Sequence, residues 1–353
     1  MNLLFDSFNI PNLDQDYELN QYAYFLYEDC LVPQLFKPIK HIIKCHIVDQ
    51  IDELDFFIYP INLCDPEVQS LNDSGKFFYD IDDRVLDKVK NSKGVILIDA
   101  TYEPIDTKKN LNLKYQIEKI FGTNNVFINT KISSLYSNDN FFTNFPSFLE
   151  FHDTNVTFAE EIKVTTPKKF CLFGSRIDKH MGGLKLIKWL KEKNLIFQGH
   201  ISLSRDNEDV DSTNYIRPFI DMDVLNYVKF NIVVAPYFDY PMCDFPMVCE
   251  KIFRNIHYSK PFILVGQFDT LAEFKRLGYQ TFNELFDESY DTEKDSDTRL
   301  QKVFTQIQQL IDKPNDFWQK HKNKLDDIHK HNLDNYENRT SKLQKFYEEI
   351  RPR

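Results

Sequence analysis

Short apolar runs alternate with amphipathic helical patterns along the first half of the chain. The run at 95–98 is almost entirely apolar, which is typical of a strand buried on both faces of a parallel sheet. Residues 82–91 instead place Val85, Leu86 and Val89 on one face of a helix. Strands alternating with helices predict an α/β domain with a parallel sheet. The expected strands are 41–48, 55–59, 95–98 and 126–129, and the expected helices are 82–91 and 112–121.

The second half repeats this alternation after a polar stretch at 157–169, which predicts a linker. We therefore expect an α/β protein of two Rossmann-like lobes with a C-terminal helical tail, divided as 1–165, 166–314 and 315–353. The elements expected in the second lobe are strands at 170–173, 200–203 and 261–265, a turn at 174–180, and helices at 184–193 and from about 249 onwards.

Two later segments have different patterns. The acidic segment 287–299 predicts a solvated loop. The tail at 315–350 has helical spacing and high charge, so we expect it to pack across a domain boundary or to stand exposed. Its expected apolar contacts are Trp318, Leu325, Ile328, Leu333, Tyr336 and Leu343.

Composition limits the possible classes of protein. A chain of 353 residues that is 42% hydrophobic can bury a sizeable core, and its net charge of −11 disfavours a broad nucleic-acid-binding surface. Six cysteines without a CxxC pair suggest neither a zinc knuckle nor a disulfide scaffold. There is no long apolar segment and no signal-peptide pattern, so we expect a soluble cytoplasmic protein. Abundant Phe, Tyr, Asn and Lys with little Gly suggest an AT-rich viral or bacterial genome.

The segment 243–271 has the order of a phosphate-recognising crossover. An acidic loop leads into a helix that begins near Glu250 and Lys251, and this helix feeds a buried strand that ends at Gly266. Free N–H groups at a helix N-terminus and a nearby ammonium group favour a bound diphosphate. The sequence therefore predicts a site suited to a nucleotide sugar.

A family resemblance rests on this segment and on 170–204, 231–238 and 278–291. In order and spacing these resemble phage, viral and bacterial glycosyltransferases of the GT-B type, distantly related to inverting fucosyltransferases. The run 250-EKIFRN-255, followed by the apolar strand that begins at Pro261, looks like the donor-binding motif of those fucosyltransferases. The first half resembles them only through 95–103.

The resemblance implies that the second lobe holds the donor nucleotide and the first lobe the acceptor. Glu250 matches the glutamate that contacts the donor ribose, Lys251 the lysine on the diphosphate, and Arg176 an arginine that supports the diphosphate. Arg254 and Asn255 either reach the donor or cap and solvate the helix. His180 lies in the same turn as Arg176 and is a further candidate for contact with the diphosphate. The turn 174–183 departs from the basic, Pro-containing turn of the family.

An inverting transfer also needs a base that takes the proton of the acceptor hydroxyl. Carboxylates at the carboxyl ends of parallel strands are well placed for this role. Glu103, in the loop after the strand 95–98, is the favoured candidate, and Asp99 at the tip of that strand is the alternate. An ordinary solvent-facing charge or a helix-capping carboxylate is the competing interpretation of these two residues.

No cofactor is expected beyond the nucleotide-diphosphate sugar as co-substrate. The triplets Asp80-Ile81-Asp82 and Asp221-Met222-Asp223 match the metal-binding DxD pattern only formally, because neither follows a strong apolar strand, so no metal site is expected. There is no P-loop motif. The acceptor is expected to be a glycan or lipopolysaccharide precursor, or a modified base of phage DNA. Cys249 and Ala235-Pro236 depart from the family pattern and favour an alternative, a catalytically inactive nucleotide-sugar-binding or assembly module.

Overall fold

The structure, a computed structural model, describes about half of the chain at the level of individual residues. For some residues, Asp99, Glu250 and Arg254 among them, only the backbone is described. The chain divides into two compact units, one formed by 1–151 with 338–353 and the other by 152–337. The described residues are 2–5, 44–62, 81–100, 126–130, 141–142, 167–173, 182–202, 215–216, 227–235, 238, 246, 248, 250–257, 259–338, 341 and 345.

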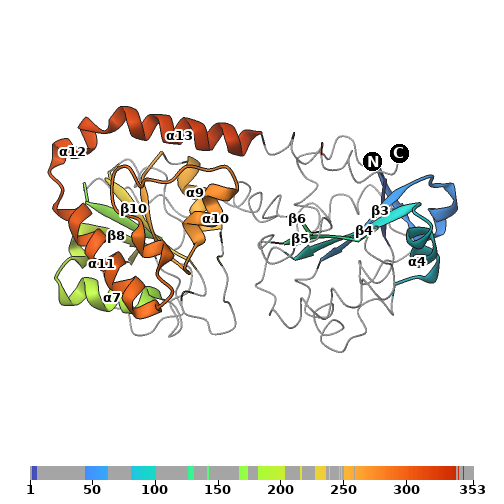
Figure 1. The fold of residues 1–353 in the computed structure, drawn as a ribbon, viewed down its shortest axis with the longest axis horizontal. Helices are drawn as coiled ribbons and strands as arrows, with labels where there is room; N and C mark the ends of the chain where they lie inside the picture. The colour runs from blue at the N-terminus through green and yellow to red at the C-terminus, as the bar shows by residue number, and fades with distance from the viewer. Residues whose placement is uncertain are drawn as a thin grey trace. The chain divides into compact units, whose positions relative to one another are not determined.

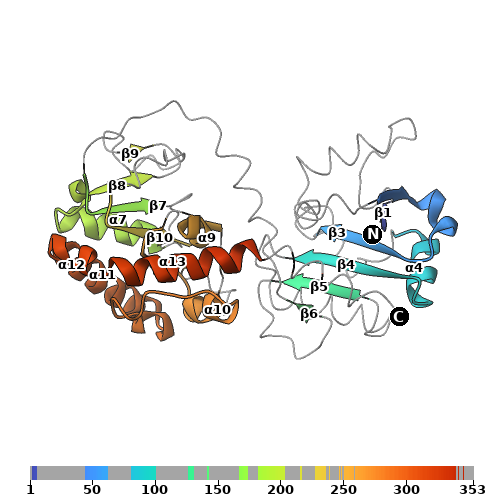
Figure 2. The ribbon, with the colours of Figure 1, turned by 90° about the horizontal axis from the view of Figure 1, so that it is seen from above.

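The first unit contains a six-stranded sheet in which every pair of neighbouring strands is parallel (Figure 2). Its strand order is β2-β1-β3-β4-β5-β6, so β1 lies between the second and third strands of the chain. This confirms the predicted α/β character of the first half. The strands are β1 (Asn2–Phe5), β2 (Lys44–Ile47), β3 (Phe57–Asn62), β4 (Gly94–Ala100), β5 (Val126–Thr130) and β6 (Phe141–Phe142).

Two elements of the first unit follow the sequence pattern with small differences. Helix α4 (Asp83–Lys90) forms where its periodicity predicts, and its apolar residues Val85 and Val89 are fully buried. The strand expected at 41–48 ends earlier, because residues from Val48 onward form a 3₁₀ helix, η2 (Val48–Glu53). The helix expected at 112–121 lies outside the described residues.

The second unit contains a five-stranded parallel sheet with the order β11-β10-β7-β8-β9. Counted from β7, this is the strand order 3-2-1-4-5 of a Rossmann fold. All five residues of β10 are buried, as expected for a central parallel strand. The strands are β7 (Phe170–Phe173), β8 (Gly199–Ser202), β9 (Tyr215–Ile216), β10 (Phe230–Val234) and β11 (Phe262–Val265).

Helices cover both faces of this second sheet (Figure 1). Helices α7 and α11 lie side by side on one face, where the rings of Trp189 and Phe304 stack with centroids 4.6 Å apart. Helices α9 and α13 pack together on the other face. The helices are α7 (Gly182–Glu192), α9 (Glu250–His257), α10 (Thr270–Arg276), α11 (Ser296–Asp312), α12 (Asn315–Lys320) and α13 (Lys322–Glu337), with 3₁₀ helices η4 (Ile196–Gln198) and η6 (Ser289–Thr292).

The acidic segment 287–299 is not the solvated loop that its composition predicts. It contains η6 and the first turn of α11, and Glu288, Tyr290, Asp291 and Arg299 are all buried. Its carboxylates have backbone partners: Glu288 accepts a hydrogen bond from the N–H of Phe282, and Asp291 accepts one from the N–H of Leu271. Composition mispredicted this segment because its acids accept hydrogen bonds from backbone N–H groups of other segments of the unit.

The predicted C-terminal helical tail forms α12 and α13, and both belong to the second unit. Trp318 of α12 stacks on Phe230 of β10 with ring centroids 6.1 Å apart. In α13 the amide of Asn332 bonds both the N–H and the C=O of Gln280, at 2.7 and 3.0 Å. Trp318, Ile328 and Tyr336 are buried as predicted, whereas Leu343 lies outside the described residues.

Candidate functional site

The strand order of the second sheet reverses between β7 and β10. From β7 the chain adds β8 and β9 on one side, then crosses to add β10 and β11 on the other. In open α/β sheets, ligands bind outside the carboxyl ends of the strands at such a reversal. Helices α7 and α9 begin at this edge because they follow β7 and β10 in the chain. The fold therefore places the candidate site at the carboxyl ends of β7 and β10.

Helix α9 begins at Glu250, as the sequence predicts. Its first turn therefore directs unbonded backbone N–H groups and the positive end of the helix dipole toward the candidate site. Lys251, in that turn, is buried, with 8% of its surface exposed. A buried lysine side chain has few accessible rotamers, so it would lose little conformational entropy on binding an anion. The side chains of Glu250 and Arg254 lie outside the description.

Asn255 lies one turn further along α9 and faces the sheet. Its Nδ2 donates to the C=O of Lys251 at 2.7 Å, and its Oδ1 accepts from Nδ2 of Asn231 in β10 at 2.6 Å. Both asparagines are almost completely buried. These bonds tie α9 to β10 and so help to set the position of Lys251, while a donor contact by Asn255 stays a prediction.

The predicted catalytic carboxylates belong to the first unit. Asp99 is the penultimate residue of β4, in register with Asn62 of β3 and Asn129 of β5, so it lies at the carboxyl end of the strands. Glu103, Arg176 and His180 lie outside the described residues, and their roles stay predictions together with those of Asp99, Glu250 and Lys251.

In the triplet at 80–82, Asp82 caps a helix, and Asp80 lies outside the described residues. The carboxylate of Asp82 caps α4 by accepting from the N–H of Arg84 at 2.8 Å, and the Arg84 guanidinium also bonds it. Hydrogen bonding by Arg84 lowers the pKa of Asp82. The triplet at 221–223 lies outside the described residues. In the described part of the chain, no group of three His, Cys, Asp or Glu side chains is arranged to hold a metal ion.

Gly182, the first residue of α7, was not singled out by sequence reasoning. A methyl group on its Cα would lie 2.8 Å from Cγ of Phe238 and 2.9 Å from Cγ1 of Val265. Only glycine allows α7 to begin this close to the segments that follow β10 and end β11. In dinucleotide-binding folds a glycine has the same purpose, the close packing of a helix against strands. The available signal was the pair Gly182-Gly183 in a chain with only 9 glycines.

Arg299 of α11 bonds the backbone segments that follow β10 and β11, next to the candidate site. Its guanidinium donates to the C=O of Gly266 after β11 at 3.0 Å and to the C=O of Phe238 after β10 at 2.9 Å. It also donates to the C=O of Glu293 and of Lys294, and it lies 4.6 Å from the ring centroid of Phe238. Arg299 is 3% exposed. One buried side chain thus fixes the segments that leave two neighbouring strands at the candidate site.

A second buried group orders the segment that follows β11. The carboxylate of Asp291 accepts from the N–H groups of Leu271 and Ala272 in the first turn of α10, at 2.9 and 3.0 Å. It thus caps α10 in place of Asp269, whose side chain makes no capping bond. Burial raises the pKa of Asp291 to about 6. Tyr290 Oη accepts from the N–H of Leu264, an outward-facing group of the edge strand β11.

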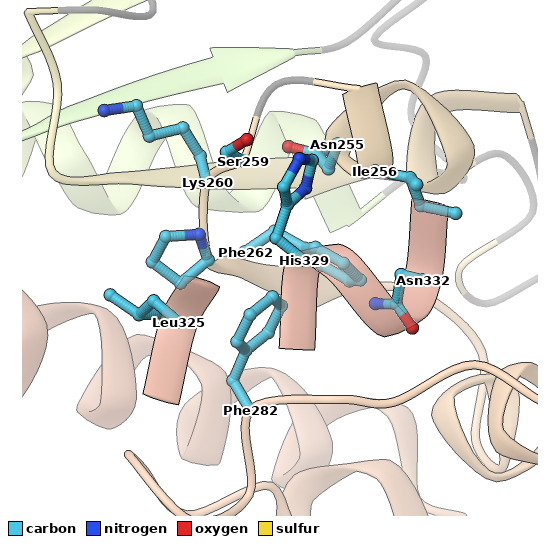
Figure 3. Close-up of a pocket in the computed structure, with 10 residues that line it drawn as sticks. Asn255, Ile256, Ser259, Lys260, Phe262, Phe282, Leu325, His329 and Asn332 are labelled. Carbon is cyan, nitrogen blue, oxygen red and sulfur yellow. The ribbon is translucent and has the colours of Figure 1, made fainter. Parts of the chain in front are cut away.

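A small hollow lies at the opposite edge of the sheet (Figure 3). It is formed where α9 ends and β11 begins, with Asn255 and Phe262 on one side and His329 and Asn332 of α13 on the other. It has room for about one water molecule. Its size and its place at the amino ends of the strands separate it from the candidate donor site.

Comparison with known proteins does not assign a family. No family model and no curated protein sequence matches the chain. A solved structure described as the glycotransferase of kitacinnamycin is similar over 98% of this chain and 85% of its own, with 11% identity and a TM-score of 0.40. At that TM-score, the likeness assigns neither a fold nor an activity to this chain. Among the described residues, no helix is long and apolar enough to cross a membrane.

Proposed function

We propose that the protein is a glycosyltransferase of the GT-B type that moves a sugar from a nucleotide-diphosphate donor to a hydroxyl acceptor. The observation that carries this proposal is the start of α9 at Glu250 and Lys251, beyond β10 at the reversal of strand order. A helix N-terminus with a neighbouring lysine is a suitable receptor for a diphosphate. The motif resemblance to fucosyltransferases independently falls on the same residues.

In the proposed reaction, Lys251 and the N–H groups of α9 stabilise the negative charge that develops on the departing diphosphate. Glu250 binds the donor ribose, and Arg176 and His180 support the phosphates. Glu103, or Asp99 in its place, removes the proton of the acceptor hydroxyl as its oxygen attacks the anomeric carbon. This displacement inverts the anomeric configuration and requires no metal ion, because the protein supplies the positive charge.

A glycan or lipopolysaccharide precursor is the proposed acceptor. The net charge of −11 disfavours extended contact with a polyanion, which a modified base in DNA would require. Transfer to hydroxymethylated DNA is the competing outcome, and both acceptor types belong in the same assay.

Donor binding and transfer should be measured separately with UDP, GDP, ADP and CMP sugars. Lys251→Met should weaken donor binding roughly 10- to 100-fold, the usual effect of losing a hydrogen bond to a charged group. Glu103→Ala should slow transfer about 10²- to 10⁴-fold with donor affinity retained. Lys188→Met, an exposed position in the middle of α7, is the matched control and should change neither quantity.

Three results bear on the proposal. Donor binding without turnover on any acceptor would support the inactive module instead. No binding of any sugar nucleotide would refute both functions. Equal loss of donor binding in Lys251→Met and Lys188→Met would show that α9 is not part of the donor site. Because Lys251 is buried, folding of each variant must be checked by tryptophan fluorescence, which reports on the second unit through Trp189 and Trp318.

A further inference from the structure

The amino edge of the second sheet brings together the segments that precede β7, β8 and β10. The N–H of Lys168 donates to the C=O of Tyr227 at 3.0 Å, and the N–H of Lys229 donates to the C=O of Lys169 at 3.0 Å. On the other side of β7, Nζ of Lys168 donates to the C=O of Phe197 at 2.6 Å. We call the surface formed by Lys168, Lys169, Phe197, Tyr227, Lys229 and Lys260 the amino-edge patch.

Two large aromatic side chains of this patch are exposed. Phe197 is 58% exposed and Tyr227 is 40% exposed. Phe197 precedes β8 and Tyr227 precedes β10, and β7 lies between these strands. Because neighbouring strands are about 4.8 Å apart, the backbones of the two residues lie roughly 10 Å from each other. The third exposed large apolar residue among those described, Leu184, lies near the start of α7 at the opposite edge. A single exposed ring is ordinary, but two on one edge mark a candidate interaction surface.

The charge of the patch is entirely positive. Its four lysines come from the segments 167–169, 227–229 and 259–261, and neither these nor the segment 196–198 contains an acid, although the whole chain carries −11. Neither Lys229 nor Lys260 forms an ion pair with a described residue. Burial, and then the ammonium of Lys229, lower the pKa of Lys260. Two neighbouring ammonium groups without a carboxylate favour a negatively charged partner.

We propose that the amino-edge patch docks the protein on an anionic lipid bilayer, with Phe197 and Tyr227 in the interface and the lysines at the head groups. Aromatic rings and lysines together are typical of the membrane–water interface, and anionic head groups attract the lysines. The patch lies at the opposite edge of the sheet from the candidate donor site, so docking leaves that site accessible within the unit.

Vesicle co-sedimentation of the full chain tests the proposal. The probes are phosphatidylcholine vesicles with and without about one third phosphatidylserine. The wild type should bind only the anionic vesicles, and added salt should weaken the binding. Each lysine near an anionic surface contributes about fivefold in affinity, so Lys229→Gln with Lys260→Gln should lose roughly 25-fold. Phe197→Ser with Tyr227→Ser should also lose at least tenfold.

Matched variants separate this patch from general effects of charge and apolarity. Lys188→Gln with Lys330→Gln removes the same charge from exposed positions in the middle of α7 and α13, and Leu184→Ser removes an exposed apolar side chain at the other edge. Both should bind anionic vesicles within about twofold of the wild type. Equal binding to both kinds of vesicle, equal loss in the control pair, or binding to an oligonucleotide but not to lipid would overturn the proposal.

Discussion

Arg299 gives the sharpest test of how the second unit holds its candidate site together. Replacing it with methionine keeps much of the apolar stem but removes every donor of the guanidinium. The carbonyls of Gly266 and Phe238, whose bonds to Arg299 are buried, then lose these donors. The carbonyls of Glu293 and Lys294 are only partly buried, so water can replace the arginine there.

The expected loss of stability follows from these contacts. Each buried carbonyl left without a donor costs about 1–3 kcal/mol. The stacking of the guanidinium on Phe238 contributes about 1 kcal/mol more, and such terms are not fully additive. We therefore expect Arg299→Met to lower the free energy of unfolding of the second unit by about 3–5 kcal/mol. Arg299→Lys keeps the charge but fewer donors, so it should lose roughly half as much.

Urea unfolding followed by tryptophan fluorescence measures this loss, because the only two tryptophans, Trp189 and Trp318, both lie in the second unit. Lys302→Met is the control on the same helix, where the lysine makes a partly exposed ion pair with Glu293, and it should change the midpoint little. A loss below about 1 kcal/mol for Arg299→Met, or equal midpoints for Arg299→Met and Lys302→Met, would refute the idea that Arg299 holds these segments together.

Three further predictions concern the same unit. Gly182→Ala should lower its stability by about 1–3 kcal/mol, because the added methyl would approach Phe238 and Val265 too closely; the same urea titration measures this, and an unchanged midpoint would contradict the packing. Asn255→Leu removes the buried hydrogen-bond partner of Asn231 and should lower the free energy of unfolding by about 1–3 kcal/mol. Adding Asn231→Leu should recover part of this loss, and additive effects of the two substitutions in a double-mutant cycle would argue against the pair. Burial raises the pKa of Asp291 from 3.8 to about 6, so the folded state binds this proton more tightly than the unfolded state. The protonated carboxyl therefore stabilises the fold below about pH 4, and this stabilisation is lost as pH rises through about 6. Relative to Asp291→Asn, the free energy of unfolding should fall by up to about 3 kcal/mol over this range; a difference that rises or stays flat would be inconsistent with the raised pKa.

The sequence predicted those features that depend on short-range patterns. The strands β7 and β11 are short apolar runs, and the start of α9 at Glu250 follows from the change of pattern after an acidic loop. The α/β character and the two successive parallel sheets followed from the alternation of these runs with amphipathic helices. The buried apolar residues of α12 and α13 were also predicted, because an apolar stripe shows on a helix, whereas the buried Asn332 was not.

Features that depend on distant partners were missed. Arg299 is buried because carbonyls from three separate segments converge on it, and no local pattern signals that convergence. Glu288 and Asp291 gave their segment the composition of a loop, although each accepts hydrogen bonds from backbone N–H groups of another segment. The purpose of Gly182 depends on Phe238 and Val265, which are more than fifty residues away in the chain.

The central claim is that α9 begins at a nucleotide-diphosphate site on the second unit. Amide hydrogen exchange of the full chain with and without UDP, GDP, ADP and CMP sugars tests this most directly. A bound donor should slow exchange in the first turn of α9, from Glu250 to Phe253, and leave residues 259–262 beside the hollow of Figure 3 unchanged. Unchanged exchange in that turn with every donor, or protection confined to 259–262, would contradict the claim.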